Sequence, residues 1–70
     1  MYNPEKELTK EQVEMLDMYK KMNITKKQVR AMKKDMARRI SAQLRITEAY
    51  ARREYVNKYL FWKELERIAQ

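Results

Sequence analysis

The spacing of capping and apolar residues along the chain predicts where two helices begin. Thr9 is followed three positions later by Gln12, the spacing of a capping box, in which each side chain bonds the backbone of the other residue. Thr25 and Gln28 repeat this spacing, and Asn23 between the two segments is the expected left-handed end of the first helix. The pattern predicts an N-terminal arm and two helices, over residues 1–8, 10–22 and 26–44.

The apolar stripe of the second predicted helix stops before the next capping residue. At about 100° per residue, one stripe holds Val29, Met32, Met36, Ile40 and Leu44. Ala49 does not continue this stripe, and Thr47 offers a third N-cap. We therefore expect a turn at Arg45 and Ile46, followed by a third helix over residues 48–69. Because residues 26–70 contain no glycine or proline, the alternative is one long helix that merges the second and third.

The third predicted helix has apolar side chains on every side. Trp62 and Leu65 share one stripe, whereas Val56 and Leu60 point nearly opposite. A helix that is apolar all round must be covered on more than one side, which a chain this short is not expected to do alone. We therefore predict a homodimer. The interface, either with a second copy or with a protein partner, is expected at Tyr55, Val56, Tyr59, Leu60, Phe61 and Trp62.

The residue inventory removes several classes of function. The 70 residues include no cysteine and no histidine, which excludes zinc fingers, iron–sulfur sites, thiol chemistry and histidine acid–base catalysis. The close carboxylate pairs, Glu11 with Glu14 and Glu64 with Glu66, lie among lysines, and no nucleophile stands beside a base. We therefore expect no catalytic residue, no cofactor and no metal site.

Hydropathy predicts one intracellular domain. The longest apolar run, residues 59–62, is far shorter than the roughly 20 residues that cross a bilayer. The N-terminus does not show the charged and apolar regions of a signal peptide. We expect a single all-α domain over residues 1–70, cytoplasmic and without a membrane partner.

The positive charge is concentrated in the middle of the chain. Seventeen Lys or Arg against ten Asp or Glu give a formal charge of +7, and residues 26–53 alone hold ten of these cations against two carboxylates. The cations opposite the apolar stripe are Lys27, Arg30, Lys34, Arg38 and Arg45. Such a row gains nothing from helical ion pairs and repels itself. It indicates a surface that binds a polyanion, the alternative being an ordinary solvated face.

The segment around the second turn resembles the helix-turn-helix of DNA-binding proteins. The segment is Ile40-Ser41-Ala42-Gln43-Leu44-Arg45-Ile46-Thr47. It shows the family's order of an aliphatic residue, a small residue, two variable positions, a leucine, a turn residue, an aliphatic residue and a capping threonine. The resemblance covers residues 40–56, with Ala51 as the inward residue of the recognition helix. It departs from the family at Arg45, where glycine is usual. Glycine is favoured there because a left-handed arginine costs roughly 1 kcal/mol.

The resemblance implies that the start of the third helix enters the major groove of DNA. The residues it implies for base contact are Glu48, Ala49, Arg52 and Arg53. Those expected to contact phosphates are Lys26, Lys27, Arg30, Lys34, Arg38 and Arg45. The alternative for Arg52 and Arg53 is a solvated pair beside two glutamates.

Together these observations predict a small, dimeric DNA-binding regulator or accessory factor, of the kind found in phages and mobile elements. The alternative is an inhibitor or adaptor that docks a larger protein through its basic and aromatic faces.

Overall fold

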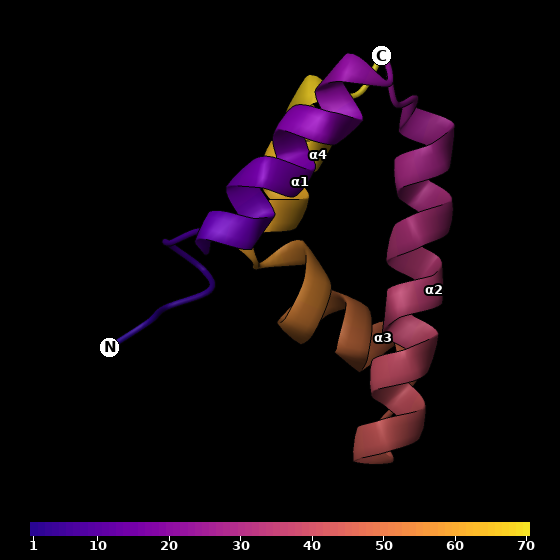
Figure 1. The fold of residues 1–70 in the computed structure, drawn as a ribbon. Helices are drawn as coiled ribbons and strands as arrows, with labels where there is room; N and C mark the ends of the chain where they lie inside the picture. The colour runs from indigo at the N-terminus through magenta and orange to yellow at the C-terminus, as the bar shows by residue number, and fades with distance from the viewer.

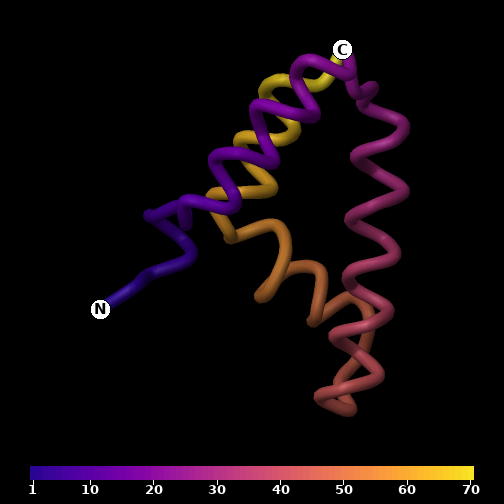
Figure 2. Tube along the Cα trace, viewed as in Figure 1, coloured from indigo at the N-terminus to yellow at the C-terminus, as the bar shows by residue number.

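The computed structural model describes all 70 residues, which form four α-helices and one π-helical turn and no strands (Figure 1). The all-α prediction is therefore confirmed. The elements are α1 (Lys10–Lys21), α2 (Lys26–Leu44), α3 (Glu48–Arg52), the π-helical turn η1 (Arg53–Asn57) and α4 (Leu60–Ile68). The α1 and α4 helices pack side by side and form one arm of the fold, and α2, which diverges from them, forms the other. The α3 helix and η1 connect these two arms of the fold (Figure 2). The molecule is accordingly flat, with extents of 35 × 32 × 15 Å.

Both capping boxes form, and they set the starts of α1 and α2. The hydroxyl of Thr9 accepts the amide of Gln12 at 3.1 Å, and the Gln12 side chain accepts the amide of Thr9 at 3.0 Å. Thr25 and Gln28 make the same two bonds, at 3.1 and 2.9 Å. The α1 helix ends one residue before the predicted position, and Asn23 has a φ of 58°, in the left-handed region expected of it.

The turn between α2 and α3 confirms that these helices do not merge. Arg45 is left-handed, with φ 56° and ψ 47°, and its amide bonds the carbonyl of Ser41. The hydroxyl of Thr47 accepts the amide of Tyr50 at 3.1 Å, so α3 begins with a side-chain cap.

The prediction of a continuous third helix over residues 48–69 is wrong. After η1, the backbone of Tyr59 is extended, with φ −79° and ψ 136°, and a new helix begins at Leu60. The amide of Leu60 bonds the carbonyl of Pro4 at 2.9 Å, so the N-terminal arm satisfies a donor that the break leaves free. The arm thereby contributes directly to the position of α4.

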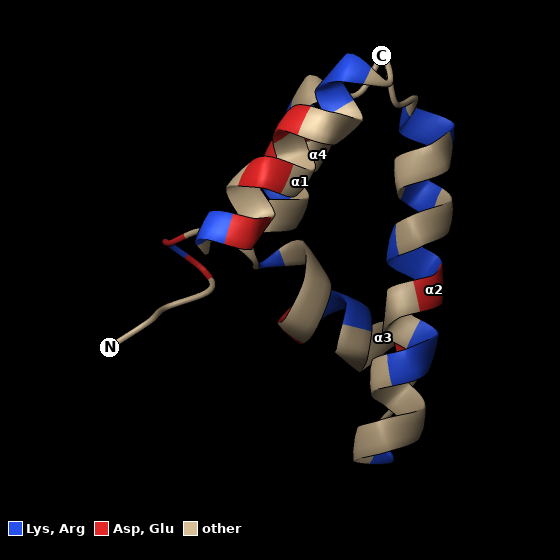
Figure 3. Cartoon of the chain, viewed as in Figure 1, with Lys and Arg blue, Asp and Glu red and all other residues tan.

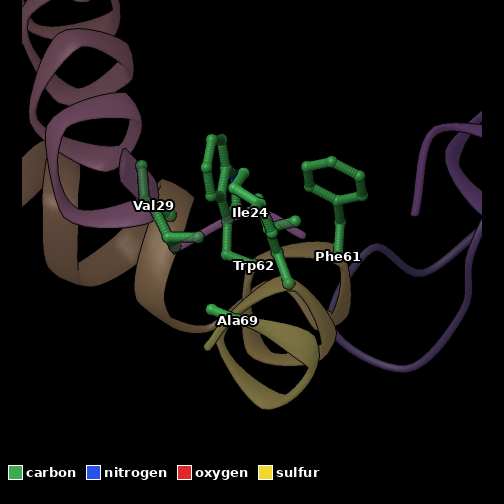
Figure 4. Packing of buried hydrophobic residues seen from close by; sticks show 7 residues of the cluster. Ile24, Val29, Phe61, Trp62 and Ala69 are labelled. Atoms are coloured by element: carbon green, nitrogen blue, oxygen red, sulfur yellow. The ribbon is translucent and has the colours of Figure 1, made fainter. Parts of the chain in front are cut away.

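The break brings apolar side chains from different sides of the segment into one core. Val56, Phe61, Trp62 and Leu65 are all buried within the single chain, where a straight helix would have pointed them in different directions. Figure 4 shows Trp62 beside Ile24 and on the side of Val29 of α2, with Phe61 on the opposite side. The physical reason given for a dimer at the C-terminal half therefore no longer holds.

The C-terminal residue is hydrogen-bonded to the segment between α1 and α2. Gln70 accepts the amide of Lys26 at 3.0 Å and donates its own amide to Ile24 at 2.9 Å. Its side chain also donates to Asn23 at 3.0 Å. These bonds fix the end of α4 to the start of α2.

Candidate nucleic-acid interface

Two alanines set the distance between α2 and α3. Ala37 and Ala51 are fully buried, and the two helices that carry them pack against each other. Because an alanine side chain ends at Cβ, the helix backbones can approach closely. Ala51 is the inward residue that the helix-turn-helix resemblance implies.

A basic cleft of about 650 Å³ opens beyond this contact, between the N-terminal half of α2 and the residues that follow α3. Five of its eight lining residues are Lys or Arg, and one is a carboxylate. We define the basic cleft by its lining: Lys26, Val29, Arg30, Lys33, Lys34, Arg52, Asn57 and Glu66. Figure 3 shows the corresponding concentration of blue on α2 and α3, whereas α1 carries both signs.

One ion pair connects the walls of the basic cleft. The ammonium of Lys33 on α2 donates to the carboxylate of Glu66 on α4, and the Lys33 side chain is only 17% exposed. The remaining cations of the cleft, Lys26, Arg30, Lys34 and Arg52, form no ion pair. The cleft therefore concentrates unneutralised positive charge, from two elements, around one concave volume.

The ten residues predicted to contact DNA do not all lie in the basic cleft. Four of them lie in the basic cleft: Lys26, Arg30, Lys34 and Arg52. Lys27, Arg45 and Ala49 are exposed outside it. Arg38 and Glu48, assigned to phosphate and base contact respectively, instead approach each other at 3.6 Å.

Arg53 is also engaged within the chain. Its guanidinium bonds the carboxylate of Glu54 at 3.1 Å and lies 5.4 Å from the ring centroid of Tyr50. Hydrogen bonds from Lys58 and Arg53 hold the pKa of Glu54 below its usual value. The same carboxylate raises the pKa of Lys58. Arg53 is thus partly neutralised, in contrast to its neighbour Arg52.

Four residues that line the cleft were not predicted as site residues: Val29, which was assigned to the apolar stripe, and Lys33, Asn57 and Glu66. Lys33 follows Lys26 and Arg30 at helical spacing, so the periodicity of α2 contained the signal for it. Asn57 and Glu66 carried no such signal, because they reach the cleft only through the packing of η1 and α4 against α2.

The residues predicted to form an interface do not make one exposed face. Val56, Phe61 and Trp62 are buried in the chain's own core, while Tyr55, Tyr59 and Leu60 are half-buried. The rings of Tyr55 and Tyr59 meet edge to face at 6.5 Å. Burial raises the pKa of Tyr59.

Comparison with protein-family models, curated proteins and solved structures finds no significant match. None of the helices has both the length and the apolar character required to cross a membrane. No three carboxylates gather in a group that could hold a metal ion.

Proposed function

We propose that this protein binds duplex DNA through the basic cleft and the adjoining face of α2, as a small regulator or accessory factor. The observation that carries the proposal is the set of unpaired cations, from two elements, around one concave volume. Lysines and arginines that neutralise phosphates release counterions, which provides a favourable free energy of binding that does not depend on sequence. A cleft of about 650 Å³ admits a segment of one sugar-phosphate backbone, but not the whole duplex.

The position of Arg52 supports a phosphate contact in preference to the base contact that the resemblance implies. It lines the cleft together with Arg30 and Lys34, so a phosphate held there would meet cations from both walls. Base contact is then left to the exposed start of α3, around Ala49, with Arg53 beside it. Phosphate contacts of this kind fix the position of a protein on DNA without reading the sequence.

The proposal is tested by fluorescence anisotropy of a labelled duplex at several salt concentrations. The test variant carries Arg30→Gln, Lys34→Gln and Arg52→Gln. The control removes the same charge from exposed lysines without an ion pair, by Lys10→Gln, Lys20→Gln and Lys63→Gln. Each lost phosphate contact should reduce the log–log salt slope by about 0.9, so the test variant should lose about 2.7 and the control far less.

Equal losses in the test and control variants would overturn the assignment of the cleft, because net charge alone would then explain binding. No binding to DNA at low salt would favour the alternative, docking of an acidic protein on the same cations. That alternative has weaker support, because Val56, Phe61 and Trp62 lie in the core and are not available as anchors for a partner.

A further inference from the structure

The α1 helix has an apolar face that nothing in the chain covers. No residue of α1 is buried. Met15, Met18 and Met22 are 39%, 48% and 66% exposed, and they fall within about 60° of one another at 100° per residue. We call these three residues the methionine face. Exposed methionines in such an arrangement suit a protein contact, because their flexible side chains adapt to an apposed surface.

An apolar groove continues this face toward α2. It has a volume of about 330 Å³ and is lined by Tyr19, Met22, Ile24, Gln28, Ala31 and Met32, none of which is charged. Met22 belongs to both the groove and the methionine face. The α1 and α2 helices do not pack against each other, so the groove between them stays open.

The distribution of charge indicates where a second copy of the chain can bind. A formal charge of +7 makes two copies of the chain repel each other through most of their surfaces. Residues 1–25 are the exception, with four lysines against five carboxylates. Self-association is therefore least opposed through the segment that contains α1.

The charges that border the methionine face are complementary to themselves in an antiparallel arrangement. Glu14 and Lys21 are seven residues apart and lie on the same edge of the face, where Lys21 also pairs with Asp17 of its own helix at 2.9 Å. A two-fold axis between Asp17 and Met18 places Glu14 of each copy beside Lys21 of the other. The same axis brings the two methionine faces together, as an isologous contact requires.

We propose that a second copy of this chain covers the methionine face and the apolar groove, with the two α1 helices antiparallel. The contact would add apolar burial to a chain in which only 9 of 70 residues are buried. It uses the side of α2 that carries Met32 and leaves the basic cleft of each copy free. This inference does not depend on the binding of DNA.

Sedimentation equilibrium of the full chain over a concentration series tests the proposal. The parent should approach twice its mass of 8.7 kDa as the concentration rises. Met18→Glu should weaken the dimer by about tenfold or more, because it buries a carboxylate without a partner. Leu44→Glu is the matched control, since Leu44 is 50% exposed at the far end of α2 and should leave the dimer unchanged.

A charge exchange tests the antiparallel arrangement itself. Glu14→Lys and Lys21→Glu should each weaken the dimer, and the double variant should restore most of the loss, because the pair is re-formed with reversed signs. Circular dichroism would show whether each variant keeps its helix content. A parent that stays monomeric at all concentrations, equal effects of Met18→Glu and Leu44→Glu, or no restoration in the double variant would each overturn the proposal.

Discussion

The two sides of α2 border cavities of opposite character. The basic cleft is lined by five cations, whereas the apolar groove is lined by none. The walls of the cleft are held by the buried contact of Ala37 with α3 and by the ion pair between Lys33 and Glu66. The walls of the groove are two helices that do not touch. One helix can therefore present a charged site of fixed shape on one side and an adaptable apolar surface on the other.

The largest expected effect is on the stability of the core, on which both cavities depend. Leu65 is fully buried in the core that joins the two arms. Leu65→Ala should lower the free energy of unfolding by about 2–5 kcal/mol, through lost burial and the cavity that remains. Urea unfolding followed by circular dichroism measures this loss, with exposed Leu44→Ala as the control. Similar values for the two variants would show that the arms do not depend on a shared core.

A substitution of intermediate effect should separate DNA binding at the basic cleft from self-association at the apolar groove. Ala51→Leu forces extra methylene groups into the fully buried contact between α2 and α3, which should cost about 1–3 kcal/mol. Because this contact sets one wall of the basic cleft, DNA affinity should fall while self-association is retained. Ala42→Leu, at an exposed position near the end of α2 and outside the basic cleft, is the control. If both activities fall in parallel, the two sides of α2 are not independent.

The smallest expected effect comes from removing the ion pair that connects the two walls of the basic cleft. Glu66→Gln removes the only carboxylate that lines the basic cleft and frees Lys33 for a phosphate. DNA affinity should rise about twofold to fivefold, whereas the stability should fall by about 1 kcal/mol, because the Glu66 side chain is half exposed and water weakens the pair. Glu64→Gln is the control, because Glu64 pairs with Arg67 outside the cleft. Unchanged or lower affinity for Glu66→Gln alone would contradict the assigned cleft.

The sequence predicted much of the local structure because the responsible interactions are short in range. The capping bonds of Thr9 and Thr25 join residues three positions apart. The left-handed Asn23 and Arg45 likewise end helices whose last turns bond to them. Of the row of cations that the helical periodicity of α2 predicted, Arg30 and Lys34 line the cleft.

The candidate site was only partly predictable. Lys26, Arg30, Lys34 and Arg52 were identified from charge and from the helix-turn-helix resemblance. Their meeting in one cleft was not, because it depends on how closely α3 packs against α2 at Ala37 and Ala51. The dimer interface expected at the C-terminal half rested on a straight helix, which the structure does not contain.

Local sequence patterns were sufficient to predict the helical class, the starts of the first three helices and the concentration of charge in residues 26–53. These properties follow from hydrogen bonds within one or two turns and from composition. The position of the break in the last segment was not predictable in this way, because it depends on the amide of Leu60 reaching the carbonyl of Pro4 and on Val56 and Trp62 sharing a core. Contacts between residues that are distant along the chain leave no periodic signal, so local patterns cannot reveal them.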